Sequence, residues 1–283
     1  MSVVAIGFFD GVHLGHQKIL KGADIAVTFR DHPLQVLNAA KAPRLIMSCE
    51  ERVAAIRACG VREVVVLDFT PALASQSPEE FLSILRLQLH TSTFTIRCGA
   101  NWRFGRNGAG NPRWLREHGI EVQVVEAAVY DGGLVSSTRI RECLSRGEIA
   151  AVNAMLGRSY RVTGFRFQGK GEGGKLGYPT INLSLCNPAP CNPAPCTLHP
   201  ALPLGVYQVS VLGHRAIANY GYAPTFGDRA WKEPVLEVHF LDEVVDVSGS
   251  GTVEFIKFIR PERKFASLAE LQAQIAADIA DLV

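Results

Sequence analysis

The sequence lacks a long hydrophobic run. Nowhere in its 283 residues are about 18 apolar residues uninterrupted, and a membrane-spanning helix needs at least that length. Met1 leads directly into a strand-like segment, without the basic region and long apolar segment of a secretory signal. We therefore expect a cytoplasmic protein with neither a membrane partner nor a signal peptide.

The sequence also has little excess of one sign of charge over the other. Lys and Arg number 29 against 27 Asp and Glu, which leaves a formal charge of +2. A nucleic-acid binder usually carries a strong basic excess, so we expect no nucleic-acid partner. With 47% hydrophobic, 20% charged and 8% aromatic residues, the composition is that of a globular protein and excludes disordered, collagen-like and coiled-coil chains.

Cysteines are few and irregularly placed. There are seven, an odd number, and four of them are scattered at Cys49, Cys59, Cys98 and Cys143. A secreted disulfide framework is therefore not expected, and reduced thiols fit better.

The other three cysteines belong to a tandem repeat. Residues 186–190 read CNPAP, residues 191–195 repeat them, and Cys196 begins a third copy. This density of proline excludes a helix or a central strand, and a spacing of five residues matches no usual zinc site. We interpret the repeat as an exposed surface loop.

The length predicts two domains, because 283 residues exceed what one core usually organises. Up to about residue 157, short apolar runs alternate with helical patterns that begin near His16, Ser48 and Ser77 and that include residues 115–118. The predicted strands are residues 3–9, 25–29, 63–69, 93–98 and 122–128. Such alternation predicts a Rossmann-like α/β domain, with helices on both sides of a parallel sheet, over residues 1–157.

The pattern changes in residues 158–283. Five further strands are predicted, at residues 160–167, 205–212, 215–219, 235–241 and 252–259. They indicate a small antiparallel β-barrel or sandwich. Apolar residues at helical spacing then follow Ser267, a good N-cap, so we expect a terminal helix at 267–282 that packs on the β domain.

A first group of chemically useful residues lies where the first strand meets the first helix. Residues 10–16 read DGVHLGH, and this junction is where an α/β sheet binds phosphate. The glycines let the backbone approach an anion, and His13 and His16 can donate hydrogen bonds to a phosphoryl group. Taken alone, the motif is also compatible with a His-x-x-His metal pair or with two surface histidines.

Residues 135–141, VSSTRIR, form a second group at the predicted start of a helix. Hydroxyl groups can cap the helix or contact phosphate, and an arginine can bind phosphate with two hydrogen bonds. By itself, Ser-Ser-Thr is more often a simple N-cap.

The glycine-rich residues 169–174, GKGEGG, formally match a dinucleotide-binding fingerprint. That fingerprint requires a following helix, whereas residues 175–182, KLGYPTIN, contain a proline and β-formers. We interpret the segment as a flap whose backbone amides and Lys175 face phosphates. A simple flexible loop is the alternative.

Together with residues 28–33 and 101–105, the first two motifs resemble the nucleotidyltransferase module of the bacterial bifunctional riboflavin kinase/FAD synthetases. Residues 177–183 resemble the GxPTxN motif of riboflavin kinases, and residues 235–240 resemble the strand that carries their catalytic glutamate. Residues 205–207, 219–226 and 259–265 also follow the family's order, so the resemblance covers nearly the whole chain.

For the first domain, the resemblance implies that the phosphate of FMN attacks the α-phosphate of ATP in line and expels pyrophosphate. It implies that His13 and His16 are catalytic and stabilise the growing charge. It further implies ATP or phosphate contacts from Gly7, Phe9, Asp10, Gly15, His32, Ser136, Ser137, Thr138 and Arg141, and flavin contacts from Asn101 and Phe104.

For the second domain, the resemblance implies that ATP phosphorylates riboflavin. It assigns Glu237 as the catalytic group that accepts the proton of the ribityl hydroxyl or orients it, and Thr180 and Asn182 as ligands of Mg²⁺. It adds ATP or phosphate contacts from Gly169, Gly171, Lys175, Gly177, Pro179, Thr180 and Asn182, and flavin contacts from Arg260 and Glu262. Without the resemblance, Glu237 is one outward charge on an alternating strand.

The expected function is thus conversion of riboflavin to FMN and of FMN to FAD, with ATP, riboflavin and FMN as small-molecule partners and Mg²⁺ as the metal. Two alternatives stay open: an enzyme that retains one of the two activities, and a flavin- or nucleotide-binding regulator without turnover. The presence of both histidines, the Ser-Arg segment and Glu237 argues against the regulator, because binding alone does not need all of them.

Overall fold

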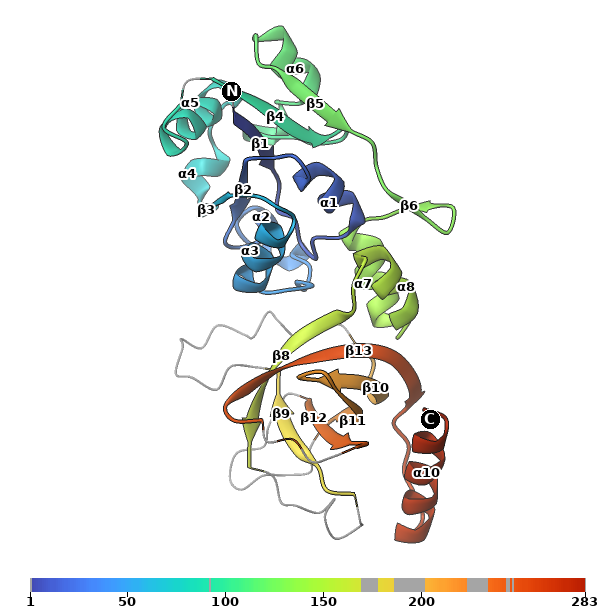
Figure 1. The fold of residues 1–283 in the computed structure, drawn as a ribbon. Coiled ribbons are helices and arrows are strands. Elements are labelled where there is room, and N and C mark those ends of the chain that lie inside the picture. Colours follow the sequence, from blue (N-terminus) through green and yellow to red (C-terminus); the bar gives the residue numbers. More distant parts are fainter. Residues whose placement is uncertain are drawn as a thin grey trace. The chain divides into compact units, whose positions relative to one another are not determined.

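A computed structural model describes residues 2–91, 93–168, 178–185, 202–222, 234–242, 245 and 247–282. The chain forms two compact units, Met1–Arg139 and Ile140–Val283 (Figure 1). Our domain boundary after residue 157 came from the change in strand pattern and stays a prediction. Within the described residues, no helix is long and apolar enough to cross a membrane.

The first unit contains a parallel five-stranded sheet in the order β3-β2-β1-β4-β5. Its strands are β1 (Ser2–Ile6), β2 (Ile25–Phe29), β3 (Glu63–Leu67), β4 (Phe94–Gly99) and β5 (Val122–Val125). The central strand β1 pairs with β2 through Val4 and Ile25, and with β4 through Ser2 and Phe94. The helix that follows β1 packs on one face of the sheet through Leu20, and the helix that follows β4 packs on the other through Leu115. The carboxyl ends of β1 and β4 therefore flank the position where such sheets bind ligands.

Helices cover both faces of this sheet, as predicted. They are α1 (Leu14–Leu20), α2 (Pro33–Leu37), α3 (Cys49–Ala58), α4 (Pro71–Ala74), α5 (Pro78–Gln88) and α6 (Pro112–Glu117), with short 3-10 turns η1 (Ala39–Lys41) and η2 (Arg106–Gly108). Val4 and Ile6 pack in a core with Leu85 of α5, whereas Ala5 between them packs in a second core with Ile56 of α3. Successive residues of β1 therefore point to opposite faces of the sheet and pack in two separate hydrophobic cores.

The predicted helix starts at Ser48 and Ser77 are confirmed by complete capping boxes. Ser48 pairs with Glu51, and Ser77 with Glu80. The predicted start at His16 was wrong by two residues, because His13 serves as the N-cap of α1 and its Nδ1 accepts the amide of His16 at 3.3 Å.

Two short strands were not predicted. β6 (Val129–Tyr130) and β7 (Gly133–Leu134) form a hairpin between β5 and α7 (Ser137–Ser145). Each has only two residues, which is too short for a hydrophobic pattern to reveal.

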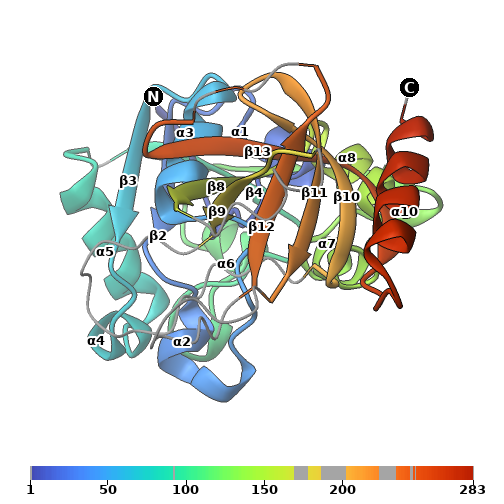
Figure 2. The ribbon, with the colours of Figure 1, turned by 90° about the horizontal axis from the view of Figure 1, so that it is seen from below.

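The second unit contains α8 (Ile149–Leu156) and a closed antiparallel barrel in the order β10-β11-β12-β9-β8-β13. Its strands are β8 (Tyr160–Phe167), β9 (Ile181–Ser184), β10 (Gly205–Val211), β11 (His214–Gly221), β12 (Val235–Phe240) and β13 (Ser250–Pro261). Figure 2 shows β10, β11 and β12 side by side. All five predicted strands are confirmed, and β9, which begins two residues after Pro179, is the one that was not predicted.

The terminal helix α10 (Leu268–Ala280) is also confirmed, with Ser267 as its N-cap. It is joined to β13 by an ion pair in which Arg260 Nε and Nη2 donate to the carboxylate of Asp278 over 2.7–3.1 Å. The side chain of Asp278 is only 4% exposed and that of Arg260 is 18% exposed.

We expect Asp278→Ala to lower the free energy of unfolding of the second unit by about 3 kcal/mol, because the substitution leaves the charge of Arg260 partly buried without its partner. Differential scanning calorimetry measures this as an earlier transition. Asp281→Ala, an exposed carboxylate at the end of the same helix, is the matched control. Equal stability of the two variants would contradict the expectation.

Candidate active sites

The loop between β1 and α1 is held in a strained conformation. Phe9 and Val12 have φ values of 55° and 40°, in the left-handed region that side chains with a Cβ rarely adopt, and Gly11 has a φ of 82°. Such strain persists only where the surrounding structure enforces it, and it clusters at functional sites.

Hydrogen bonds from three other segments enforce this conformation. Thr28 Oγ1 donates to the carbonyl of Phe8 at 3.0 Å, and Ser137 Oγ donates to the carbonyl of Asp10 at 2.8 Å. The buried carboxylate of Asp10 accepts the amide of Ile46 at 3.0 and 3.2 Å. Asp10 and Ser137, both predicted as phosphate ligands, thus fix the shape of the loop in this structure.

The two histidines of this loop stack against each other, with ring centroids 3.6 Å apart and planes 20° apart. His13 is 5% exposed. Since its Nδ1 accepts the amide of His16, the neutral ring carries its proton on Nε2.

His16 is neutral at pH 7. Burial of the ring, and secondarily the charge of His13, holds the pKa of His16 well below its usual value. Within the described residues, its Nδ1 is buried without a hydrogen-bond partner, so the proton is better placed on Nε2. Each ring of the pair therefore offers an Nε2–H donor, and His16 offers it as a neutral group.

Gly15 is required by the position of the His13 ring. A Cβ at residue 15 would lie 3.1 Å from Cε1 and 3.2 Å from Nδ1 of His13, closer than side chains normally approach. The glycine of the motif thus lets the first histidine lie against the start of α1.

Gly15→Ala is therefore expected to displace the His13 ring and to lower FAD formation from FMN about 10- to 100-fold, since sub-ångström placement matters for transfer reactions. Initial rates followed by chromatography give the measurement. Gly99→Ala is the matched control, because its Cβ would make an ordinary 3.8 Å contact with Ile19. A Gly15→Ala enzyme as fast as the control would contradict the role given to this ring.

The remaining predicted ATP contacts of the first unit surround the same strand ends. Gly7 directly follows β1, and His32 caps α2, where its Nδ1 accepts the amide of Leu34 at 3.1 Å. Ser136 Oγ accepts the amide of Arg139 at 3.2 Å, so this hydroxyl is an N-cap of α7. Thr138 is exposed.

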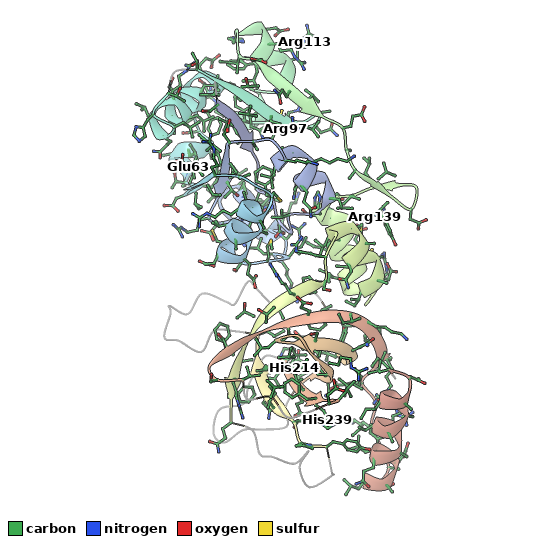
Figure 3. All side chains as sticks on the ribbon, in the orientation of Figure 1. Glu63, Arg97, Arg113, Arg139, His214 and His239 are labelled. Atoms are coloured by element: carbon green, nitrogen blue, oxygen red, sulfur yellow. The ribbon has the colours of Figure 1, made fainter. Side chains whose placement is uncertain are left out.

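The two arginines of this segment lie differently. Arg139, labelled in Figure 3, donates through Nη1 to the carbonyl of Tyr130 at 2.7 Å and so holds the β6–β7 hairpin. Arg141 lies beyond the last residue of the first unit, and its contact with phosphate stays a prediction.

The predicted flavin contacts of the first unit follow β4. Asn101 is exposed, whereas Phe104 is only 7% exposed. The ring of Phe104 stacks on Trp102 at 4.7 Å and meets Trp114 edge-on at 5.7 Å. Trp102, which is half-buried, is thus the more accessible aromatic next to Asn101.

In the second unit, strand register brings polar residues into one row. Glu237 of β12 lies opposite Asn182 of β9 on one side and opposite Asn219 of β11 on the other. Residues directly opposite each other in an antiparallel pair share a face of the sheet. Because Leu236 and Val238 are buried, the row lies on the outer face of the barrel.

Glu262 joins this row through Asn219, whose Nδ2 donates to Glu262 Oε1 at 3.4 Å. Gly221 has no room for a Cβ beside this carboxylate. Asn219 was not predicted as a site residue. The segment 219–226 resembles the family's pattern, but only the register with Glu237 places Asn219 in this row.

The motif that precedes β9 is held by His239, which Figure 3 labels in the barrel. His239 Nδ1 lies 2.9 Å from the carbonyl of Pro179, and its ring meets Tyr178 edge-on at 5.3 Å. Thr180 is half-buried and Asn182 is 7% exposed. The other predicted ATP contacts, Gly169, Gly171, Lys175 and Gly177, lie outside the described residues.

The row supplies amide and carboxylate oxygens, the ligand type that Mg²⁺ prefers. Within the described ranges, no three His, Cys, Asp or Glu side chains gather as a protein-only metal site. Arg260, predicted to contact flavin, directs Nε and Nη2 at Asp278 and Nη1 at the carbonyl of Pro261.

An α/β unit with a histidine pair at the carboxyl edge of its sheet, followed by a barrel with a carboxylate-amide row, defines a two-part transferase of the nucleotidyltransferase and kinase type. Residues 1–139 match the family model described as FAD synthetase, and residues 156–282 match the model described as riboflavin kinase. The chain belongs to the bifunctional riboflavin kinase/FMN adenylyltransferase family, and the predicted resemblance is confirmed.

Relatives match nearly the whole chain. It is 32% identical to the bifunctional riboflavin kinase/FMN adenylyltransferase of Bacillus subtilis and 31% identical to that of Escherichia coli K12, in both cases over 98% of this chain and 90% of the relative. A crystal structure described as a macrolide-efflux protein from Streptococcus pneumoniae is similar with a TM-score of 0.81 at 28% identity, over 98% of this chain and 92% of that one.

Proposed function

We propose that the barrel phosphorylates riboflavin with ATP to give FMN, and that the α/β unit transfers AMP from a second ATP to FMN, giving FAD and pyrophosphate. The observation that supports the proposal is that each unit has its own cluster of polar side chains of the kind that phosphate transfer needs, the stacked pair His13 and His16 in one and the Asn182–Glu237–Asn219 row in the other. We assign the reactions to residues 1–157 and 158–283, and we place the enzyme in the cytoplasm.

In the α/β unit, a phosphate oxygen of FMN attacks the α-phosphorus of ATP in line. The bond from the α-phosphorus to the bridging oxygen of the β-phosphate breaks, and pyrophosphate leaves. His13 and His16 donate from Nε2 to the non-bridging α-phosphate oxygens, and these bonds strengthen as charge grows in the transition state. Because His16 is neutral, it has no proton to transfer beyond the one it shares in that bond.

The other predicted ligands of the α/β unit have supporting roles in this scheme. The hydroxyls of Ser136, Ser137 and Thr138 and the guanidinium of Arg141 bind the phosphates that leave. Asn101 contacts the flavin beside Trp102 and Phe104.

In the barrel, the terminal ribityl hydroxyl of riboflavin attacks the γ-phosphorus of ATP, and ADP leaves. The carboxylate of Glu237 accepts the hydrogen bond of that hydroxyl, orients its oxygen and takes up its proton. Asn182 and Asn219 lie opposite Glu237 on the two neighbouring strands.

The oxygens of Thr180 and Asn182 fit Mg²⁺, which when bound offsets phosphate charge. Lys175 and the amides of the glycine-rich segment are further phosphate contacts. Glu262, held by Asn219, faces the flavin side of the row.

The test incubates the purified chain with riboflavin, ATP and MgCl₂ and separates the flavins by chromatography. We expect FMN to accumulate first and FAD to follow, and both to stop with EDTA and resume with excess Mg²⁺. A second incubation starts from FMN and isolates adenylyl transfer, which distinguishes an enzyme with one activity from one with two. If neither product forms, the proposal fails.

A further inference from the structure

Arg52 of α3 is a fully buried charge in the first unit, with 0% of the residue exposed. Its Nη2 donates to two consecutive carbonyls, that of Phe29 at 2.5 Å and that of Arg30 at 3.0 Å. These carbonyls lie at the carboxyl end of β2, just before His32. The guanidinium therefore holds the backbone from which His32 extends.

The same guanidinium also supports His32 from a second direction. Its central carbon lies 4.2 Å from the centroid of the Phe8 ring, within the range of a cation–π contact. The Phe8 ring in turn meets the His32 ring edge-on, with centroids 4.8 Å apart and an angle of 76°. Arg52, Phe8 and His32 thus form one continuous chain of contacts near the ends of β1 and β2.

This arrangement is costly for the fold. Within the described part of the chain, Nε and Nη1 of Arg52 are buried without a hydrogen-bond partner. Burial also lowers the pKa of the guanidinium, although Cys49, Asp10 and Asp31 raise it in part. Unpaired buried donors destabilise a fold, and an apolar side chain of similar volume is often at least as stable in such a place. Stability alone does not explain an arginine here.

We propose that Arg52 is a positioning residue for adenylyl transfer, which fixes His32 against the nucleotide by holding the Phe29 and Arg30 carbonyls and by stacking under Phe8. The inference rests on the proposed function, because it assumes that His32 faces ATP. His32 Nδ1 accepts the amide of Leu34, so the neutral ring presents Nε2–H to the ligand. A small rotation of the ring redirects that donor.

Arg52→Met keeps the volume and removes both the carbonyl hydrogen bonds and the charge. We expect kcat/KM for ATP in FAD formation to fall about 10- to 100-fold, with little change in KM for FMN. FMN formation from riboflavin, measured in the same preparation, stays unchanged because it uses the other unit. Arg57→Met is the matched control, since Arg57 is an exposed arginine on the same helix.

A double-mutant cycle distinguishes positioning from a general structural role. If Arg52 acts through His32, then Arg52→Met adds little to the loss caused by His32→Ala, whereas independent effects would multiply. Phe8→Leu should show the same non-additivity with His32→Ala. Arg52→Lys, which keeps a donor near the two carbonyls, should recover most of the activity.

Multiplicative losses with His32→Ala, or an Arg52→Met enzyme equal to Arg57→Met, would overturn the proposal. If Arg52→Met does not fold, two other variants test the proposal. Phe8→Leu must be non-additive with His32→Ala, and Arg52→Lys must keep most of the activity. A wild-type chain that makes FMN but no FAD would instead refute the proposed adenylyl transfer, so the two failures are distinguishable.

Discussion

His16→Ala is expected to lower FAD formation from FMN by at least about 10²-fold, the effect of removing one donor aimed at transition-state charge, while FMN formation from riboflavin continues at the wild-type rate. The reason is the geometry of the pair. His13 and His16 stack with centroids 3.6 Å apart, so loss of one ring removes a donor and also the support of the other.

The measurement follows both products in one preparation, with FMN supplied separately for the second reaction. His118→Ala is the control, because it removes another histidine of the same unit. The side chain of His118 is 44% exposed. Equal loss of both activities in His16→Ala would contradict the division of labour between the two units.

Glu237→Ala is expected to have the opposite pattern, with FMN formation reduced by about 10³-fold, within the usual contribution of a positioned general base, and adenylylation of supplied FMN unchanged. Glu237 lies between Asn182 and Asn219 on adjacent strands. Removal of the carboxylate therefore leaves the row without its acceptor while the barrel pairing persists.

Glu254→Ala is the matched control, since Glu254 is a half-buried glutamate on β13 of the same barrel. It should phosphorylate riboflavin at nearly the wild-type rate. Kinase turnover that persists in Glu237→Ala would remove this carboxylate from its assigned role.

Most of the fold could be predicted because its signals are local. Apolar runs marked the long strands, and Ser48 and Ser77 marked helix starts that the structure confirms. The start of α1 could not be placed in the same way, because histidine is an unusual N-cap and its ring acts only in this loop. β9 lacked a local signal, since a four-residue strand after Pro179 depends on its partners β8 and β12.

The candidate sites show a sharper division. The motif around His13 and His16 predicted the hydrogen-bond donors of the first site, because a phosphoryl group that binds at the end of a strand needs such donors. Residues that act through distant partners gave no signal: Arg52 reads as one polar position of a helix until its carbonyl partners more than 20 residues away are known. Arg260 likewise found a partner in Asp278, which no spacing rule connects to it.

The order of strand pairing has a consequence for synthesis on the ribosome. The sheet of the first unit needs only residues up to Val125 to join all its strands, whereas the barrel closes only when β13, which ends at Pro261, pairs with both β8 and β10. A chain cut short before Ser250 would carry a complete first sheet next to an open barrel. The unpaired edges of β8 and β10 would then be templates for aggregation, so we expect a chain that ends before Ser250 to be less soluble than the loss of one strand and the terminal helix alone suggests.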